Sequence, residues 1–319
     1  DPAGAQIIMD TSAWQTWLQH PLPGRPPRHI HLVGIGGSGL SAIARVLLQM
    51  GFQVSGSDRQ DSATLAELRT LGATIFVGHA ALQVAGADLV LISSAVPADN
   101  PEVAAALAAA IPVVKREAFL AALLQTRTLI AVAGTHGKTT TTGMIATVLA
   151  GAGMQPGFIV GGLVRNLGVN AAAGAGDLFV IEADEYDHMF WGLHPAVAVV
   201  TNVEWDHPDC YPTAADFDAA FVRFVSQIRP AGWLVACADD PGAQRLAAGQ
   251  EAAGFLFGHG RHPPELRRSA EEQQSRRVRP VGHRLLAGHL DGLIDRLTEH
   301  VDNDSAKVDS STSDLNKCN

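Results

Sequence analysis

The chain repeats one pattern, a short apolar run followed by a helical segment, and this repetition constrains its fold more than any other feature. Between about residues 29 and 111 the runs HIHLVGI, FQVSGSD, TIFVG and ADLVLISSAV alternate with helical segments. Apolar runs of this length predict buried strands, and strands that alternate with helices predict a parallel sheet with right-handed crossovers. We therefore predict a Rossmann-like α/β domain over residues 29–125, preceded by a leader and helix over residues 1–28.

The pattern starts again after the helical segment VVKREAFLAALLQTRT. The runs LIAVAG, DLFVIEAD, AVAVVTNV and GWLVACAD predict the strands of a second α/β domain over residues 126–260. Beyond residue 260 the sequence becomes polar and charged, as in PPELRRSAEEQQSRRVRP. We expect residues 261–319 to form a divergent tail with one amphipathic helix flanked by disorder.

Composition and cysteine spacing exclude several kinds of partner. The 319 residues carry a formal net charge of -9, which argues against sequence-independent binding of nucleic acid, because such binding needs clustered Lys and Arg. Cys210, Cys237 and Cys318 are far apart and lack CxxC spacing, as is typical of a reducing cytoplasm. No apolar run reaches the roughly 18 residues that would cross a bilayer. We expect a cytoplasmic protein without membrane insertion, and the oligomeric state stays open.

A glycine-rich loop joins the first predicted strand to its helix. Gly34, Gly36 and Gly39 form G-x-G-x-x-G, and Asp58 follows at the end of the next strand. In this context the motif predicts a diphosphate site, since glycines allow close backbone approach and helix amides meet the phosphates. The motif does not distinguish NAD from a UDP-sugar, and a purely packing role for the glycines is the alternative.

The stretch GTHGKTTTT joins the strand LIAVAG to the next helix and predicts a second phosphate site. It is shorter than the Walker A pattern G-x-x-x-x-G-K-[ST], because Val132 stands where that pattern has its first glycine. Lys138 is suited to bridge the outer phosphates, and the hydroxyl of Thr139 to bind magnesium. A capped, threonine-rich helix start is the alternative, and it leaves the Gly137-Lys138 pair unexplained.

Acidic side chains and a histidine follow two further strands of this domain. Glu182 lies near the end of DLFVIEAD, and Asp206 and His207 follow AVAVVTNV, so we expect them at the carboxyl edge of the sheet, where ligands bind. Glu182 and Thr139 are natural magnesium ligands, because magnesium prefers oxygen. By residue type alone, His207 is as much a supporting or capping residue as a ligand. The neighbouring acidic residues Asp184, Glu185 and Asp187 are consistent with a solvated turn. We favour this interpretation for Asp187.

The segments GTHGKTTTT, IEADEYD and TNVEWDHPD resemble, in this order, the nucleotide loop and the two metal-site segments of the Mur ligases, the ATP-dependent amino-acid ligases of peptidoglycan precursor synthesis. The resemblance implies catalytic roles for Lys138, Glu182 and His207, with Thr139 and Glu182 on one magnesium ion and His207 on a second. It also implies that the ATP triphosphate is held by Gly134, Thr135, His136, Gly137, Lys138, Thr139 and Thr140.

Segments of the first domain narrow the resemblance within the family. HLVGIGGSGLSAIARVL, GSD, SSAVPADNPEV and IPVVKREAFLAALL are similar to the member that joins L-alanine to the carboxylate of UDP-N-acetylmuramate through an acyl phosphate. A relative that attaches a recycled peptide to the same sugar nucleotide stays open as an alternative, as does a UDP-sugar-binding module without turnover. An NAD-dependent oxidoreductase would leave GTHGKTTTT unexplained. The implied sugar-nucleotide residues are Gly36, Gly37, Ser38, Gly39, Ser57, Asp58, Ser94 and Asn170.

The resemblance extends from about Met9 to Gly260. The family's third domain, which closes over ATP and positions the amino acid, has no recognisable counterpart in the sequence, so we expect a C-terminally truncated ligase. Domain closure excludes water and aligns the reactants. We therefore expect UDP-sugar binding, weaker ATP binding and little ligation by this chain alone.

Overall fold

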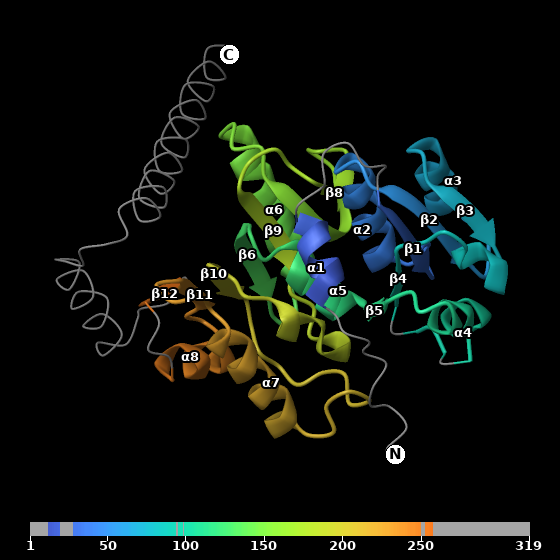
Figure 1. Cartoon of the computed structure of the whole chain (residues 1–319). Coiled ribbons are helices and arrows are strands. Elements are labelled where there is room, and N and C mark those ends of the chain that lie inside the picture. Colours follow the sequence, from blue (N-terminus) through green and yellow to red (C-terminus); the bar gives the residue numbers. More distant parts are fainter. Residues whose placement is uncertain (1–11, 20–27, 94, 98, 250–252, 258–319) are drawn as a thin grey trace, which may run out of the picture.

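The computed structural model describes residues 12–19, 28–93, 95–97, 99–249 and 253–257. Within these ranges the strands form a sheet of five and a sheet of seven strands, with helices packed against both (Figure 1). This confirms the predicted α/β class, with a parallel first sheet followed by a second sheet that carries the GTHGKTTTT loop. None of the described helices is long and apolar enough to span a membrane. The predicted tail over residues 261–319 and the candidate Ser94 lie outside the described residues.

The first sheet is parallel and has the order β3-β2-β1-β4-β5. Its strands are β1 (His29–Val33), β2 (Gln53–Asp58), β3 (Thr74–Val77), β4 (Leu89–Ile92) and β5 (Val113–Lys115). The helices between and after them are α2 (Ser38–Gln49), α3 (Ala63–Thr70), the 3-10 helix η2 (Ala81–Val84), α4 (Pro101–Ala108) and α5 (Arg116–Leu123). The strand order reverses between β1 and β4, and a ligand crevice is expected outside the carboxyl ends of the strands at that point.

The second sheet has the order β12-β11-β10-β6-β9-β7-β8. Its strands are β6 (Thr128–Ala133), β7 (Gly157–Val164), β8 (Val169–Ala172), β9 (Leu178–Glu182), β10 (Val197–Val200), β11 (Trp233–Cys237) and β12 (Ala253–Phe257). Its helices are α6 (Lys138–Gly151), the 3-10 helix η3 (Tyr186–Gly192), α7 (Ala214–Ser226) and α8 (Pro241–Ala248). The sequence does not predict β7 and β8, which pair antiparallel at one edge. β7 is buried along its first half and alternates along its second, so a single strand period does not describe it.

The central strand β6 lies between β9 and β10 and runs parallel to both. Parallel strands end at the same edge of a sheet, so the segments that follow these three strands leave side by side. They are GTHGKTTTT, IEADEYD and TNVEWDHPD. The predicted convergence of three loops at one carboxyl edge is therefore confirmed.

One hydrophobic core cluster joins the two sheets and the helix α1 (Ser12–Gln19). Trp14 of α1 stacks on Phe119 of α5, with ring centroids 6.1 Å apart. In the same cluster Phe217, Phe221 and Phe224 form the buried face of α7, since residues three and four apart share one side of a helix. The second sheet also contacts the first domain at α2, where the Ala173 amide donates to Gln49 Oε1 at 2.7 Å, and Figure 1 shows β8 beside α2. This packing places the β7–β8 hairpin along the helix that leaves the first glycine loop.

Candidate functional site

The end of β2 holds the first glycine loop in shape. The amides of Gly34 and Ile35 donate to the Ser57 carbonyl oxygen at 2.8 and 3.0 Å. The Gly36 amide donates to Asp58 Oδ2 at 2.9 Å, and a Cβ atom at Gly36 would lie 2.8 Å from that oxygen. A larger residue at Gly36 would therefore displace the carboxylate. Asp58, expected to contact the ligand, uses one of its oxygens to fix the loop.

The first loop ends at the positively polarised start of α2. Gly37 is the N-cap residue and Ser38 begins the helix. The guanidinium of Arg116 lies over Gly39 so closely that a Cβ atom there would contact Nη1. Backbone amides, a helix dipole and a nearby cation together favour a diphosphate at this position.

Ser57 differs from the expected substrate contact. Its hydroxyl is fully buried and donates to Glu102 Oε2 at 2.6 Å. The same carboxylate lies 3.0 Å from His31 Nε2 and 3.0 Å from His79 Nδ1. Burial alone would raise the pKa of Glu102, but hydrogen bonds with His31, Ser57 and His79 outweigh burial and lower the pKa. Ser57 therefore supports the loop from within the core instead of presenting its hydroxyl to the crevice.

In the second loop, the side chain of Lys138 folds back against its own backbone and a buried carboxylate. Nζ donates to the Gly134 carbonyl oxygen at 2.6 Å and to Glu185 Oε1 at 2.8 Å. The side chain of Lys138 is 15% exposed and that of Glu185 is 0% exposed. Burial raises the pKa of Glu185, although the hydrogen bond and charge of Lys138 act in the opposite direction. The cation of the loop is thus held by an acidic partner that the protein itself supplies.

The start of α6 supplies a second anion-binding helix end. Gly137 is the N-cap residue and has a φ of 82°, a left-handed conformation that favours glycine. Lys138, Thr139 and Thr140 form the first turn, where backbone amides have no intrahelical acceptor and lie at the positive end of the helix dipole. Phosphate groups are stabilised at such a terminus.

The segment after β10 is bonded to the second glycine loop. Thr135 Oγ1 donates to the Glu204 carbonyl at 2.7 Å and accepts from the Glu204 amide at 2.9 Å. The His136 amide donates to Asn202 Oδ1 at 2.8 Å, and Thr201 Oγ1 donates to the His136 carbonyl at 2.7 Å. The His136 amide, expected to face phosphate, therefore has a side-chain acceptor in this structure.

Glu185 also lies beside His207. His207 Nε2 is 3.6 Å from Glu185 Oε1 and 3.8 Å from Asp206 Oδ2. The imidazole packs edge-on against Tyr186, with ring centroids 5.2 Å apart. Glu185 therefore stands between the two candidate catalytic residues Lys138 and His207.

The sequence leaves a solvated acidic turn open for Glu185, and the structure does not bear this alternative out, because the side chain is fully buried. The chain turns into η3 directly after Glu185, and the Tyr211 hydroxyl donates to the Glu185 carbonyl at 2.5 Å. These contacts draw the turn onto the core. The available signal is the second glutamate of IEADEYD, which lies three residues after Glu182, the last residue of β9.

Glu182 and Thr139 both lie against the glycines of β7. A Cβ atom at Gly161 would be 2.7 Å from Glu182 Oε2, and one at Gly162 would be 3.4 Å from Thr139 Cγ2. Glu182 Oε1 and Glu185 Oε2 are buried without a hydrogen-bond partner among the described residues. Buried carboxylate oxygens without partners are costly, and a cation would satisfy them, so these residues fit magnesium. Across the described ranges, no group of three or more His, Cys, Asp and Glu side chains surrounds one metal position, so a bound ion would need further oxygen ligands.

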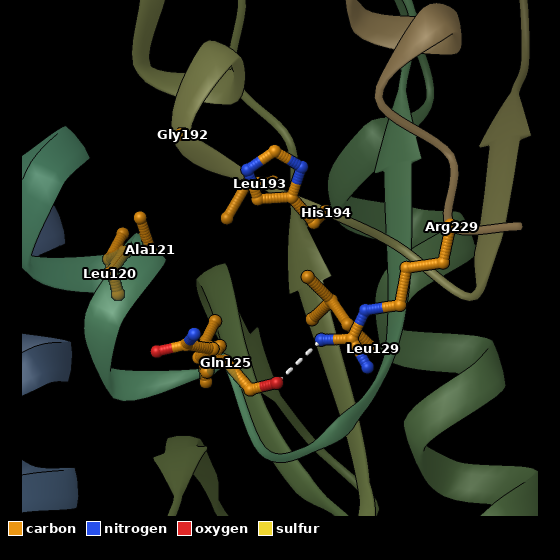
Figure 2. A pocket seen from close by; sticks show the side chains of 9 residues that line it. Leu120, Ala121, Gln125, Leu129, Gly192, Leu193, His194 and Arg229 are labelled. Carbon is orange, nitrogen blue, oxygen red and sulfur yellow. Dashed lines mark hydrogen bonds between the residues drawn. The ribbon is translucent and has the colours of Figure 1, made fainter. Parts of the chain in front are cut away.

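Two cavities lie on different sides of this region. One, of about 250 Å³, lies between α2, α3 and the β7–β8 hairpin and brings the candidates Ser38 and Asn170 together. The other, of about 230 Å³, is mostly apolar and includes Leu129, near the amino end of β6, whereas the glycine loop leaves its carboxyl end. Figure 2 shows Arg229 at this second cavity, with its guanidinium bonded to the Gln125 carbonyl at 2.8 Å. The second cavity therefore lies at the opposite end of β6 from the second glycine loop.

The order of the two sheets and the two loops matches a known class of protein. A family model described as "Mur ligase family, catalytic domain" matches residues 29–128, and the model of the Mur ligase middle domain matches residues 132–280. A solved structure of UDP-N-acetylmuramate:L-alanyl-gamma-D-glutamyl-meso-diaminopimelate ligase from Neisseria meningitides is 31% identical, with a TM-score of 0.68 over 72% of this chain and 78% of that chain. The chain belongs to the Mur ligase family.

Several relatives within the family share the name UDP-N-acetylmuramate--L-alanine ligase. The UDP-N-acetylmuramate--L-alanine ligase of Renibacterium salmoninarum is 53% identical over 70% of this chain and 48% of its own length. That of Frankia casuarinae is 48% identical over 69% of this chain and 45% of its own length. The solved UDP-N-acetylmuramate-alanine ligase of Thermotoga maritima is 32% identical, with a TM-score of 0.66 over 73% of this chain and 53% of that chain. The chain spans about half the length of the curated relatives that it matches.

Proposed function

We propose that this chain functions as an ATP-dependent ligase, which joins L-alanine to the carboxylate of UDP-N-acetylmuramate in peptidoglycan precursor synthesis. The observation that carries the proposal is the pair of Lys138 and Glu185, 2.8 Å apart, beside carboxylate oxygens that lack a partner in the described part of the chain. Such a site suits nucleotide phosphates and magnesium. The names of the relatives above support the choice of the two substrates.

We assign the ATP triphosphate to the second glycine loop. Lys138 would exchange Glu185 for phosphate oxygens, and the first amides of α6 would bind the same group. Thr139, Glu182 and His207 would hold magnesium, whose charge would offset the negative charge of the transferring phosphoryl group. The cradle consists of Gly134, Thr135, His136, Gly137, Lys138, Thr139 and Thr140.

We assign the sugar nucleotide to the first loop, with its diphosphate on residues 36–39 and Asn170 on the facing hairpin. Asp58 keeps the loop in shape. A carboxylate oxygen of the muramate would attack the γ-phosphorus of ATP. A bond between that oxygen and phosphorus forms, the bond from the γ-phosphorus to the bridging oxygen breaks, and ADP leaves. The amine of L-alanine would then form the amide bond and release phosphate. The protein's part is to hold the carboxylate, the phosphate and Lys138 together away from water.

In this proposal residues 29–125 form the sugar-nucleotide domain and residues 126–260 the ATP domain of a cytoplasmic enzyme. A second candidate is ligation of a recycled peptide to the same sugar nucleotide, and the similarity to the Neisseria peptide ligase favours it. The L-alanine reaction is better supported, because the relative named for it is 53% identical and the peptide ligase 31%.

A reaction assay separates these candidates. The full chain is incubated with UDP-N-acetylmuramate, ATP, magnesium and L-alanine, and phosphate release and sugar-nucleotide binding are measured. Release that requires both UDP-N-acetylmuramate and L-alanine supports the proposal, and release that requires the peptide in place of L-alanine supports the second candidate. Binding without release in either mixture would indicate a UDP-sugar-binding module. Tight NADH binding without UDP-sugar binding would refute all three.

A further inference from the structure

The cavity between α2, α3 and the β7–β8 hairpin contains a buried guanidinium whose hydrogen bonds are incomplete. Its volume is about 250 Å³, and its wall is formed by two helices of the first domain and by the β7–β8 hairpin of the second sheet. The polar side chains of the wall are those of Ser38, Ser41, Arg45, Thr64, Glu67 and Asn170. The sequence does not single out Arg45, because it occupies an ordinary position in the middle of α2.

The guanidinium of Arg45 has an ion-pair partner at Nη2 but no hydrogen-bond acceptor at Nε within the described residues. Its side chain is 8% exposed, and Nη2 lies 2.6 Å from Oε1 of Glu67, whose side chain is 56% exposed. Nε is buried and has no hydrogen-bond partner in the described ranges. A buried donor without an acceptor is destabilising, so the position of Arg45 is better explained if a ligand supplies the acceptor.

The charge of the pair decides which acceptor fits. Glu67 already compensates the positive charge of Arg45, and a second carboxylate at Nε would place two negative groups on one guanidinium. A neutral oxygen avoids that repulsion. The hydroxyl and amide groups of Ser41, Thr64 and Asn170 add neutral hydrogen-bonding partners to the wall. The cavity therefore suits an amide carbonyl more than an anion.

The position of the cavity says which part of a ligand would reach it. Ser38 begins α2 beside the first glycine loop, and Arg45 lies seven residues further, about 10 Å along the helix. On the opposite wall, Gly161 and Gly162 separate the cavity from Glu182 and Thr139 of the second site. A sugar attached to a diphosphate on the first loop would lie in this cavity, between α2 on one side and Gly161 and Gly162 on the other.

We propose that Arg45 is a specificity-determining residue, whose Nε–H donates to the carbonyl oxygen of the 2-acetamido group of the sugar nucleotide. The inference rests on the proposed function and adds the group that the cavity reads. In N-acetylmuramate, the lactyl group, which ends in the carboxylate, is joined through an ether oxygen to the ring carbon next to the one that bears the acetamido group. Binding the acetamido group on the Arg45 side of the glycine wall turns the carboxylate towards Lys138 and Glu182.

The test uses ligands that differ by one group, titrated calorimetrically into the full 319-residue chain. UDP-N-acetylglucosamine and UDP-glucose differ in the 2-acetamido group, and UDP-N-acetylmuramate adds the lactyl carboxylate. We expect Arg45→Met to reduce the preference for UDP-N-acetylglucosamine over UDP-glucose about tenfold and to leave the UDP-glucose affinity unchanged. Arg45→Lys should behave in the same way, because it keeps the charge and loses Nε. The matched control is Arg69→Met, since Arg69 of α3 forms an exposed ion pair with Asp61 at 2.8 Å and does not line the cavity.

Three outcomes would overturn the inference. Equal losses for UDP-N-acetylglucosamine and UDP-glucose would give Arg45 a structural role only. A selective loss for UDP-N-acetylmuramate against UDP-N-acetylglucosamine would mean that Arg45 reads the carboxylate. An unchanged acetamido preference in both Arg45 variants would show that another group reads it. Failure of the proposed function is distinct, since wild-type protein would then show no preference for UDP-N-acetylmuramate or bind no UDP-sugar.

Discussion

The two glycine loops have the same architecture but offer different chemical groups to a ligand. Both leave the carboxyl end of a parallel strand and enter a helix. The first loop is closed by hydrogen bonds from its own amides to the Ser57 carbonyl and to the Asp58 carboxylate. The second carries a lysine whose counter-ion, Glu185, is fully buried. The first loop therefore offers backbone donors in a fixed shape, whereas the second adds the side-chain cation of Lys138.

This difference assigns separate tasks to the loops. Backbone amides and a helix end bind a diphosphate without changing it. A lysine, a hydroxyl and unpartnered carboxylate oxygens can follow charge as it moves during phosphoryl transfer. We infer that the chemistry takes place at the second loop and that the first loop retains the substrate.

The largest expected effect comes from Lys138→Ala. It removes the cation of the second loop, so ATP affinity should fall roughly 100-fold or more, because charge-assisted hydrogen bonds are lost. UDP-sugar affinity should stay within the error of the measurement. Calorimetric titration of each ligand tests both statements. Loss of both affinities in a folded variant would mean that the loops do not act separately.

Glu182→Gln should act on magnesium. Loss of groups that only support a metal ligand costs roughly 10- to 100-fold in metal affinity, and we expect at least the lower figure for this carboxylate. The magnesium concentration for half-maximal ATP binding should rise accordingly. Asp184→Asn is the matched control, because the Asp184 side chain is partly exposed and lies 3.9 Å from Arg116. An equal response of the two variants would remove Glu182 from the metal site.

A smaller effect, of about tenfold, is expected at the first loop. Asp58→Ala removes the acceptor of the Gly36 amide, so the loop loses its shape and UDP-sugar affinity falls. Asp58→Asn keeps an acceptor oxygen and should retain most of the affinity, and ATP binding should be unchanged in both variants. Tighter UDP-sugar binding by Asp58→Ala would contradict this account, since it would mean that the carboxylate competes with phosphate for the amide.

The smallest effect concerns stability. The folded-state pKa of Glu102 is lowered, so its contribution is present above the ordinary glutamate pKa of about 4.3 and is lost as the pH falls through the lowered value. Glu102→Gln should cost about 1 kcal/mol of unfolding free energy at neutral pH, and the difference from wild type should vanish in acid. Urea unfolding between pH 3 and 7 measures it, with the exposed Glu204→Gln as control. A difference that persists unchanged in acid would show that the charge of Glu102 is not involved.

Much of the fold follows from local patterns in the sequence. The apolar runs predict four of the five strands of the first sheet, and the LIAVAG, DLFVIEAD and AVAVVTNV runs predict the three central strands of the second. The strand β5 is missed, because it begins VVKREAFLAALLQTRT, which the sequence predicts to be helical throughout. β7 and β8 are not predicted, because their exposure follows from the helix α2 that packs on the hairpin. Local sequence carries no record of that contact.

The candidate site is divided in the same way. Glu182 ends β9, and Lys138, Thr139 and His207 lie in the segments that follow β6 and β10, so topology brings all four to one edge of the sheet. Glu185 and Arg45 are not predicted, because their burial depends on residues from other elements. The contact of Ser57 with the sugar nucleotide stays a prediction, and the structure places its hydroxyl in the core, which the sequence does not indicate.

Glu185 can be regarded as a placeholder. It lies on the lysine where we expect a phosphate, and Asn202 Oδ1 does the same for the His136 amide. The loop is thus moulded around oxygen atoms before any nucleotide arrives. Nucleotide binding then exchanges Glu185 and Asn202 for phosphate oxygens in a loop that is already ordered, so the entropy cost of ordering the loop is avoided. The affinity for the nucleotide then depends on the free energy of breaking these two contacts.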